Sequence, residues 1–346
     1  MAAKMVVKGG LNVDVSSGVL PYSDAALRCA AQKLVAGGPH QFNIACFGTS
    51  VTAGGMKRAS RYPAQLQGHL RQRFPRSSIE VKSFGYPGSS AQYMHACVDR
   101  LLPTHGTDLY IVELADNFIS GRAQSLAALS ALTDIVHSLR ERVAAGGRPA
   151  AVAILAPFPQ SCSKRLARIG PFQSLPTDAT SMHRLVESCF DANSTLPGIM
   201  EAFASREHVG GVSVRHAMAA ALRATTSRGD APAAVAATRK LAAIRAFFLT
   251  FLNRDYVHPN AIGYGIIANS VIEMIARAAA AATPSDCAAS TLTPSSMLSP
   301  RAPAARPSPH RRVCAFGEAL HSHVLSARGW SYRTLSPPYR PWPLPT

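Results

Sequence analysis

The sequence predicts an α/β fold: a three-layer αβα, doubly wound parallel sheet of about five strands, followed by a disordered C-terminal tail. Short apolar runs rich in Val, Ile and aromatic residues recur through the first two thirds of the chain, with helix-compatible segments between them. The runs are almost continuously apolar, which is typical of strands covered on both faces. After about residue 282 this alternation stops, and Pro, Ser and Arg dominate.

Each predicted strand is followed by a turn signal and then by a predicted helix, and this order indicates parallel strands joined by crossover helices. The Ala-rich segment 216–252, broken by Gly229 and Pro232, predicts two inserted helices. The predicted strands are 42–48 (FNIACFG), 78–85 (SIEVKSFG), 108–115 (DLYIVELA), 151–158 (AVAILAPF) and 208–215 (HVGGVSVR). The predicted helices between them are 24–36, 62–73, 90–102, 121–145 and 181–192.

Three regions follow from this pattern. Residues 1–39 form an N-terminal extension with the first helix, 40–282 the α/β domain, and 283–346 a tail rich in Pro, Ser and Arg. The tail holds 11 of the 25 prolines, so we expect most of it to be a flexible arm. Within it, the apolar spacing of 314–332 predicts a short amphipathic helix, a candidate start of an incomplete further domain.

Composition indicates a globular protein with a basic surface. In 346 residues, 47% are hydrophobic and 16% charged, and 36 Lys+Arg against 19 Asp+Glu give a net charge of +17. An acidic partner, such as an anionic glycan, a membrane surface or a nucleic acid, therefore has to be considered. The basic residues are scattered, without finger spacing or aromatic interleaving, so we do not expect nucleic-acid binding. No signal peptide or transmembrane segment is visible, which predicts a soluble protein of unassigned compartment.

The seven cysteines are odd in number and widely spaced, without a CxxC pair or a Cys/His cluster. They indicate neither a zinc site nor a disulfide scaffold. We expect most of them to be small buried apolar residues, with one or two disulfides left open.

In an open parallel sheet, ligands bind beyond the carboxyl ends of the strands. The first predicted strand ends in GTSVTAGG, where a glycine-flanked turn places Ser50 like a nucleophile. Ser50 as a simple helix cap is the alternative. The second strand leads into GYPGSS, where the N–H of Gly88 is a possible oxyanion donor or, alternatively, only part of a turn.

The third strand closes with ELADN, whose Asn117 can supply an amide donor to the same crevice or serve as a turn residue. Its acidic residues, Glu113 and Asp116, receive no catalytic role. The fourth motif, DYVHPN, places Asp255 and His258 three residues apart on a turn that opens the last helix. An acid and an imidazole in this arrangement suit a general-base pair, although a surface pair is the alternative.

Together, the four motifs over roughly residues 40–280 resemble the blocks of the SGNH hydrolase superfamily, the GDSL esterases and lipases. The resemblance implies a flavodoxin-like SGNH hydrolase fold. It also implies a Ser-His-Asp triad of Ser50, His258 and Asp255 that forms an acyl-enzyme without metal or organic cofactor. The implied oxyanion hole consists of Ser50, Gly88 and Asn117.

The chain departs from the family pattern at four positions. Thr49 stands where the family usually has the acid of its GDS block, and Ser83 stands where an Asn is often found. In the third block, Ala115 replaces a glycine and Phe118 an acid, which bears on how Asn117 is aimed. None of these changes removes a reacting group.

The resemblance implies an esterase acting on small O-acyl groups, such as O-acetyl groups on carbohydrate. Its expected partner is thus a small-molecule or glycan ester. Two alternatives stay open: an O-acyltransferase using the same triad, and a non-catalytic carbohydrate-binding protein.

Overall fold

A five-stranded parallel sheet forms the centre of the molecule, with the strands in the order β4-β3-β5-β6-β7. In chain order this is second, first, third, fourth and fifth, the flavodoxin-like arrangement, so the predicted fold class is confirmed. The strands are β3 Gly38–Gly48, β4 Ser77–Gly85, β5 Leu109–Glu113, β6 Ala151–Ala156 and β7 Gly210–Ser213. The computed structural model describes residues 4–7, 11–21, 24–54, 60–114, 122–144, 147–158, 196–218, 249–253 and 258–289.

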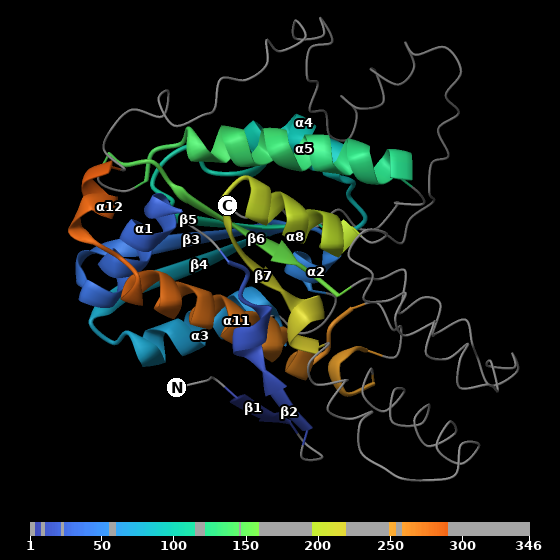
Figure 1. Cartoon of the computed structure of the whole chain (residues 1–346), viewed down its shortest axis with the longest axis horizontal. Helices are drawn as coiled ribbons and strands as arrows, with labels where there is room; N and C mark the ends of the chain where they lie inside the picture. The colour runs from blue at the N-terminus through green and yellow to red at the C-terminus, as the bar shows by residue number, and fades with distance from the viewer. Residues whose placement is uncertain are drawn as a thin grey trace, which may run out of the picture. The chain divides into compact units, whose positions relative to one another are not determined.

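Helices cover both faces of the sheet, which gives the three layers (Figure 1). One face carries α1 Ala25–Ala36, α3 Tyr62–Arg73 and α11 Ala261–Ala280, and the opposite face carries α4 Ala91–Leu101, α5 Arg122–Arg140 and α8 Leu196–Arg206. Shorter elements are the 3-10 helix η1 Val15–Gly18, α2 Ser50–Ala53 and α12 Pro284–Ala289. Within the described ranges, no helix has both the length and the apolar character needed to span a bilayer.

Local sequence explains where these elements begin. The side chains of Asp24, Ser90 and Asn260 accept backbone N–H groups at the starts of α1, α4 and α11, which satisfies donors that have no partner within the helix. All residues of β5 and β6 are buried, because helices cover the sheet on both sides.

The structure also contains elements that the sequence pattern missed. The segment read as an N-terminal extension includes an antiparallel hairpin, β1 Lys4–Val7 with β2 Leu11–Asp14. Helix α8 lies between the helix predicted at 181–192 and the strand predicted at 208–215, where no element was predicted. The helix expected at 181–192, most of the segment 216–252 and the helix expected at 314–332 lie outside the described residues.

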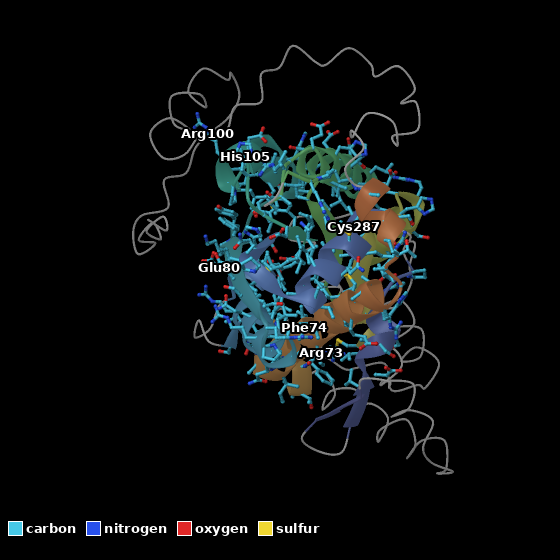
Figure 2. The ribbon with its side chains drawn as sticks, turned by 90° about the vertical axis from the view of Figure 1, so that its left-hand side faces the viewer. Arg73, Phe74, Glu80, Arg100, His105 and Cys287 are labelled. Carbon is cyan, nitrogen blue, oxygen red and sulfur yellow. A yellow bond between two sulfur atoms is a disulfide. The ribbon has the colours of Figure 1, made fainter. Side chains whose placement is uncertain are left out.

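The cysteines include disulfides, of which the sequence left one or two open. Cys29 in α1 forms a disulfide with Cys287 in α12, and Cys97 is disulfide-bonded as well. Figure 2 labels Cys287, on the part of the molecule where α12 lies beside α1. Cys46 in β3 fits the prediction, since it is free and buried. The sequence did not predict the Cys29–Cys287 pair, because its members are 258 residues apart.

Candidate active site

Ser50 lies directly beyond the carboxyl end of β3, as the first residue of the short helix α2. The chain leaves β3 for β4 on one side and later returns to β5 on the other, so the end of β3 lies at the switch point of the sheet. A Cβ added at Gly48 would overlap the side-chain oxygens of Thr52 and Glu113. Only glycine therefore allows the turn before Ser50 to pack this closely.

Glu113, at the end of β5, is a buried carboxylate that accepts hydrogen bonds from the Ser50 turn. Its Oε2 accepts the N–H of Thr49 at 2.8 Å, the N–H of Thr52 at 3.2 Å and the hydroxyl of Thr52 at 2.8 Å. Its Oε1 accepts the hydroxyl of Thr49 at 3.0 Å. Glu113 is 0% exposed. From the sequence, Glu113 received no catalytic role, and the contacts seen here are structural ones with the turn.

The Glu113 network continues away from the turn into the core. The hydroxyl of Thr52 lies 3.2 Å from that of Tyr62, which is itself fully buried beside Cys46. Burial raises the pKa of Glu113, although the hydrogen bonds from Thr52 and Thr49 oppose that rise. Burial also raises the pKa of Cys46 to about 12, so its thiol stays protonated at neutral pH.

The loop that carries Gly88 is tied to the Ser50 turn. The N–H of Tyr86 donates to the carbonyl of Gly48 at 2.8 Å, and the hydroxyl of Ser83 donates to the carbonyl of Thr52 at 3.1 Å. Ser83 thus contacts the Ser50 turn from the position where the SGNH pattern often has Asn. Gly88 is exposed with a φ of 71°, a left-handed conformation that favours glycine.

His258 lies just before α11, in a loop held by two asparagines. The N–H of Asn253 donates to the carbonyl of His258 at 2.8 Å, and its side chain donates to the carbonyl of Pro259 at 3.0 Å. Asn260 caps α11 through its oxygen, while its amide nitrogen donates to the carbonyls of Thr250 and Leu252. This network fixes the position at which the His258 loop enters α11.

The structure describes some of the predicted site residues and brings two of their segments together. Val51, next to Ser50, and Pro259, next to His258, line the same small apolar hollow. Within the described part of the chain, the Ser50 hydroxyl makes no hydrogen bond. Asp255 and Asn117 lie outside the described residues.

The arrangement supplies a serine at a helix start and a histidine on an adjoining loop. Among the described residues, no cluster of His, Cys, Asp and Glu has the form of a metal site. Sequence reasoning missed Glu113, although one signal was present: an acid that closes an otherwise apolar strand, with threonines on both sides of Ser50.

Comparison with known proteins gives a likeness of fold. No family model and no curated protein matches the chain. Among solved structures, a two-domain esterase (CEX) active on acetylated mannans aligns with a TM-score of 0.51 and 15% identity, over 77% of this chain and 57% of that chain. The present chain therefore spans little more than half of that protein.

Two further structures are similar over a smaller part of this chain. An acetylxylan esterase from Geobacillus stearothermophilus aligns with a TM-score of 0.44 and 15% identity, covering 69% of this chain and 95% of that one. A lipolytic protein of the G-D-S-L family from Veillonella parvula DSM 2008 has a TM-score of 0.42 and 16% identity, covering 69% and 100%. At 15% identity, the likeness to the two-domain esterase is a likeness of fold.

Proposed function

We propose that this protein is a serine esterase that removes small O-acyl groups, such as acetyl, from carbohydrate. The observation that carries the proposal is the position of Ser50, at the carboxyl end of β3 and at the switch point of the sheet. The turn that presents Ser50 is anchored from inside by Glu113 and joined to the loop of Gly88. A site held in this way suits a group that must be aimed at a substrate.

In the proposed reaction, His258 takes the proton from the Ser50 hydroxyl as Oγ attacks the ester carbonyl, and Asp255 orients the imidazole. The tetrahedral oxyanion is held by the N–H groups of Ser50 and Gly88 and by the amide of Asn117. The alcohol leaves with the proton carried by His258. Water, deprotonated by the same imidazole, then attacks the acyl-enzyme and releases the acid.

A small apolar hollow is lined by Val51 and Pro259, the neighbours of Ser50 and His258 in the chain. Its volume is about 20 Å³, and its other walls include Phe158, Val214 and Met218. The esterase with which the chain shares its fold is active on acetylated mannans, so acetylated polysaccharides are the first substrates to test.

A fluorophosphonate probe tests the nucleophile directly, because it reacts with activated serines and leaves ordinary hydroxyls unmodified. We expect labelling of the wild type and none of Ser50→Ala. Ser17→Ala is the matched control, since Ser17 is an exposed serine in η1, and it should be labelled like the wild type. A wild type that is not labelled would contradict the proposal.

Product analysis separates the esterase from the other functions that the sequence leaves open. With acetylated mannan or xylan, we expect free acetate in proportion to the esters lost. Transfer of acetyl groups to an added oligosaccharide would instead identify an acyltransferase. Polysaccharide binding without any labelling would identify a binding protein.

A further inference from the structure

We infer that Glu113 is a positioning residue for the nucleophile, because its carboxylate is the internal acceptor that fixes the turn carrying Ser50. This inference rests on the proposed function, since it assigns a role in aiming the same serine. Glu113 itself contacts no substrate in this scheme. It acts through the two threonines that flank Ser50 and Val51.

Three donors converge on one oxygen of Glu113. Oε2 of Glu113 accepts both backbone N–H groups, from Thr49 and Thr52, together with the Thr52 hydroxyl. Backbone N–H groups can only donate, and a buried donor without an acceptor costs about 1–3 kcal/mol. The turn can therefore keep its conformation only while an oxygen occupies this point.

Four carbonyl groups of the turn accept hydrogen bonds as well. The carbonyl of Gly48 accepts from Tyr86, that of Thr49 from Ala53, that of Ser50 from Gly54 and that of Thr52 from Ser83. Within the described residues, the N–H of Ser50 is left without such a partner. It is the same group to which the proposed mechanism assigns the oxyanion. Glu113 thus draws the neighbouring donors inward and leaves this one available.

The charge of Glu113 and its hydrogen-bond geometry have different effects on the protein. Burial raises its pKa above the usual range of a glutamate. A carboxyl group whose pKa is raised on folding destabilises the folded state at neutral pH, where it must be ionised. The negative charge of Glu113 therefore lowers the stability of the folded state. The turn needs the side-chain oxygen only as a hydrogen-bond acceptor.

This division predicts opposite results for two substitutions of similar size. Glu113→Gln keeps an amide oxygen at the Oε2 position, while its NH₂ group can donate to the hydroxyl of Thr49. It should retain kcat within about threefold. Glu113→Met fills the space with apolar atoms and provides no oxygen, so the turn must rearrange. We expect kcat to fall by about 10- to 100-fold, with KM changed by less than about twofold.

Asp108 at the amino end of the same strand supplies the matched control. It is a buried carboxylate and accepts the N–H of Asn43 in β3 at 2.9 Å, as Glu113 accepts that of Thr49. It lies at the other end of the sheet from Ser50. Asp108→Leu should lower the melting temperature but keep kcat near that of the wild type. An equal loss of kcat in Asp108→Leu and Glu113→Met would mean a general structural effect and would overturn the inference.

The experiment measures kcat and KM on an acetyl ester, the rate of fluorophosphonate labelling and the melting temperature for the wild type and these variants. If the wild type is not labelled, the proposed function fails. If the wild type is labelled and Glu113→Met reacts at the same rate with full kcat, the positioning role alone fails. Should Glu113→Met not fold, Thr52→Val and Thr52→Ser decide. The first removes a donor to Glu113 and should lose activity, whereas the second keeps the hydroxyl and should retain it.

Discussion

At the scale of single residues, the surroundings of Thr49 explain how a threonine is accommodated where the SGNH pattern usually has the acid of its GDS block. The Thr49 hydroxyl donates to Glu113 at 3.0 Å inside a fully buried network. An aspartate there would place a second carboxylate against the first, and two such groups cannot both ionise. Threonine at position 49 is thus the complement of glutamate at position 113.

Thr49→Asp tests this complementarity. We expect it to lower the free energy of unfolding by about 1–3 kcal/mol. The like-charge contact raises the carboxyl pKa values in the folded state, so the loss should grow as pH rises from about 4 towards neutrality. Urea unfolding at several pH values measures it. In a Glu113→Gln background the penalty should largely disappear, and a penalty that persisted there would contradict the charge explanation.

The proposed triad makes a second prediction at this scale. Ser50→Ala and His258→Ala should each lower kcat by about 10⁴- to 10⁶-fold, and the double variant should be scarcely worse, because the residues act as one unit. Asn117→Ala should cost less, about 10²- to 10³-fold, since it removes one of several oxyanion donors. Steady-state kinetics on one ester, with circular dichroism to confirm folding, measures the set. Full activity in Ser50→Ala would remove the nucleophile assignment.

Sequence could indicate the predicted site residues because each follows a recognisable strand or turn. Ser50 and Gly88 follow apolar runs, and His258 precedes a proline and a helix cap. Glu113 could not be found in this way, since its partners are 61 to 64 residues away along the chain. A contact between neighbouring parallel strands becomes visible only when the strand order is known.

At the scale of elements, the strands buried on both faces were the most predictable features. Four of the predicted helices were also found, with differences confined to their ends: α1, α3, α4 and α5 correspond to those predicted at 24–36, 62–73, 90–102 and 121–145. The hairpin β1–β2 was missed because its strands have four residues each and are separated by glycines. Helix α8 was missed because Pro197 and Gly198 in its first turn look like a loop signal, although proline fits the start of a helix.

The cap of α11 gives a prediction for the loop that carries His258. The Asn260 side chain accepts the N–H groups of Ile262 and Gly263 and also donates to the carbonyl of Thr250. Asn260→Ala should lower the free energy of unfolding by about 0.5–2 kcal/mol through the lost cap. It should lower kcat as well, because the loop of His258 loses its anchor. Asn260→Asp keeps the cap oxygen and should restore most of the stability but less of the activity. Unchanged kcat in Asn260→Ala would show that the cap does not position His258.

At the scale of the whole molecule, a clasp between α1 and α12 joins distant parts of the chain. It consists of the Cys29–Cys287 disulfide and the adjacent ion pair of Arg28 with Asp286. Helix α12 begins at Pro284, past the boundary at 282 suggested by composition. Composition did not reveal α12 because it is short and lies at the start of a proline-rich segment.

The ion pair of the clasp predicts a loss of stability in acid. Hydrogen bonding to Arg28 holds the pKa of Asp286 well below its usual range. A carboxyl group with a lowered pKa stabilises the folded state above its unfolded pKa of about 3.9, and that contribution is lost as pH falls below it. Arg28→Leu should therefore be less stable than the wild type at neutral pH, and the difference should shrink below about pH 4. Thermal unfolding across this range measures it, and a constant difference would contradict the role of the pair.

The clasp also predicts where the chain can be shortened. A chain ending after Ala289 keeps α12, whereas one ending after Ala282 loses the disulfide, the ion pair and the helix together. Removing a native disulfide that closes so long a loop typically costs about 2–5 kcal/mol. We therefore expect the longer form to unfold near the temperature of the full chain and the shorter form to unfold well below it.

The double variant Cys29→Ala/Cys287→Ala in the full chain isolates the disulfide. The melting temperature of this double variant should lie between those of the forms ending at 282 and 289. A reducing agent cannot lower it by breaking the Cys29–Cys287 bond, because the variant lacks that bond. Equal stability of the forms ending at 282 and 289 would show that the clasp contributes nothing to the fold.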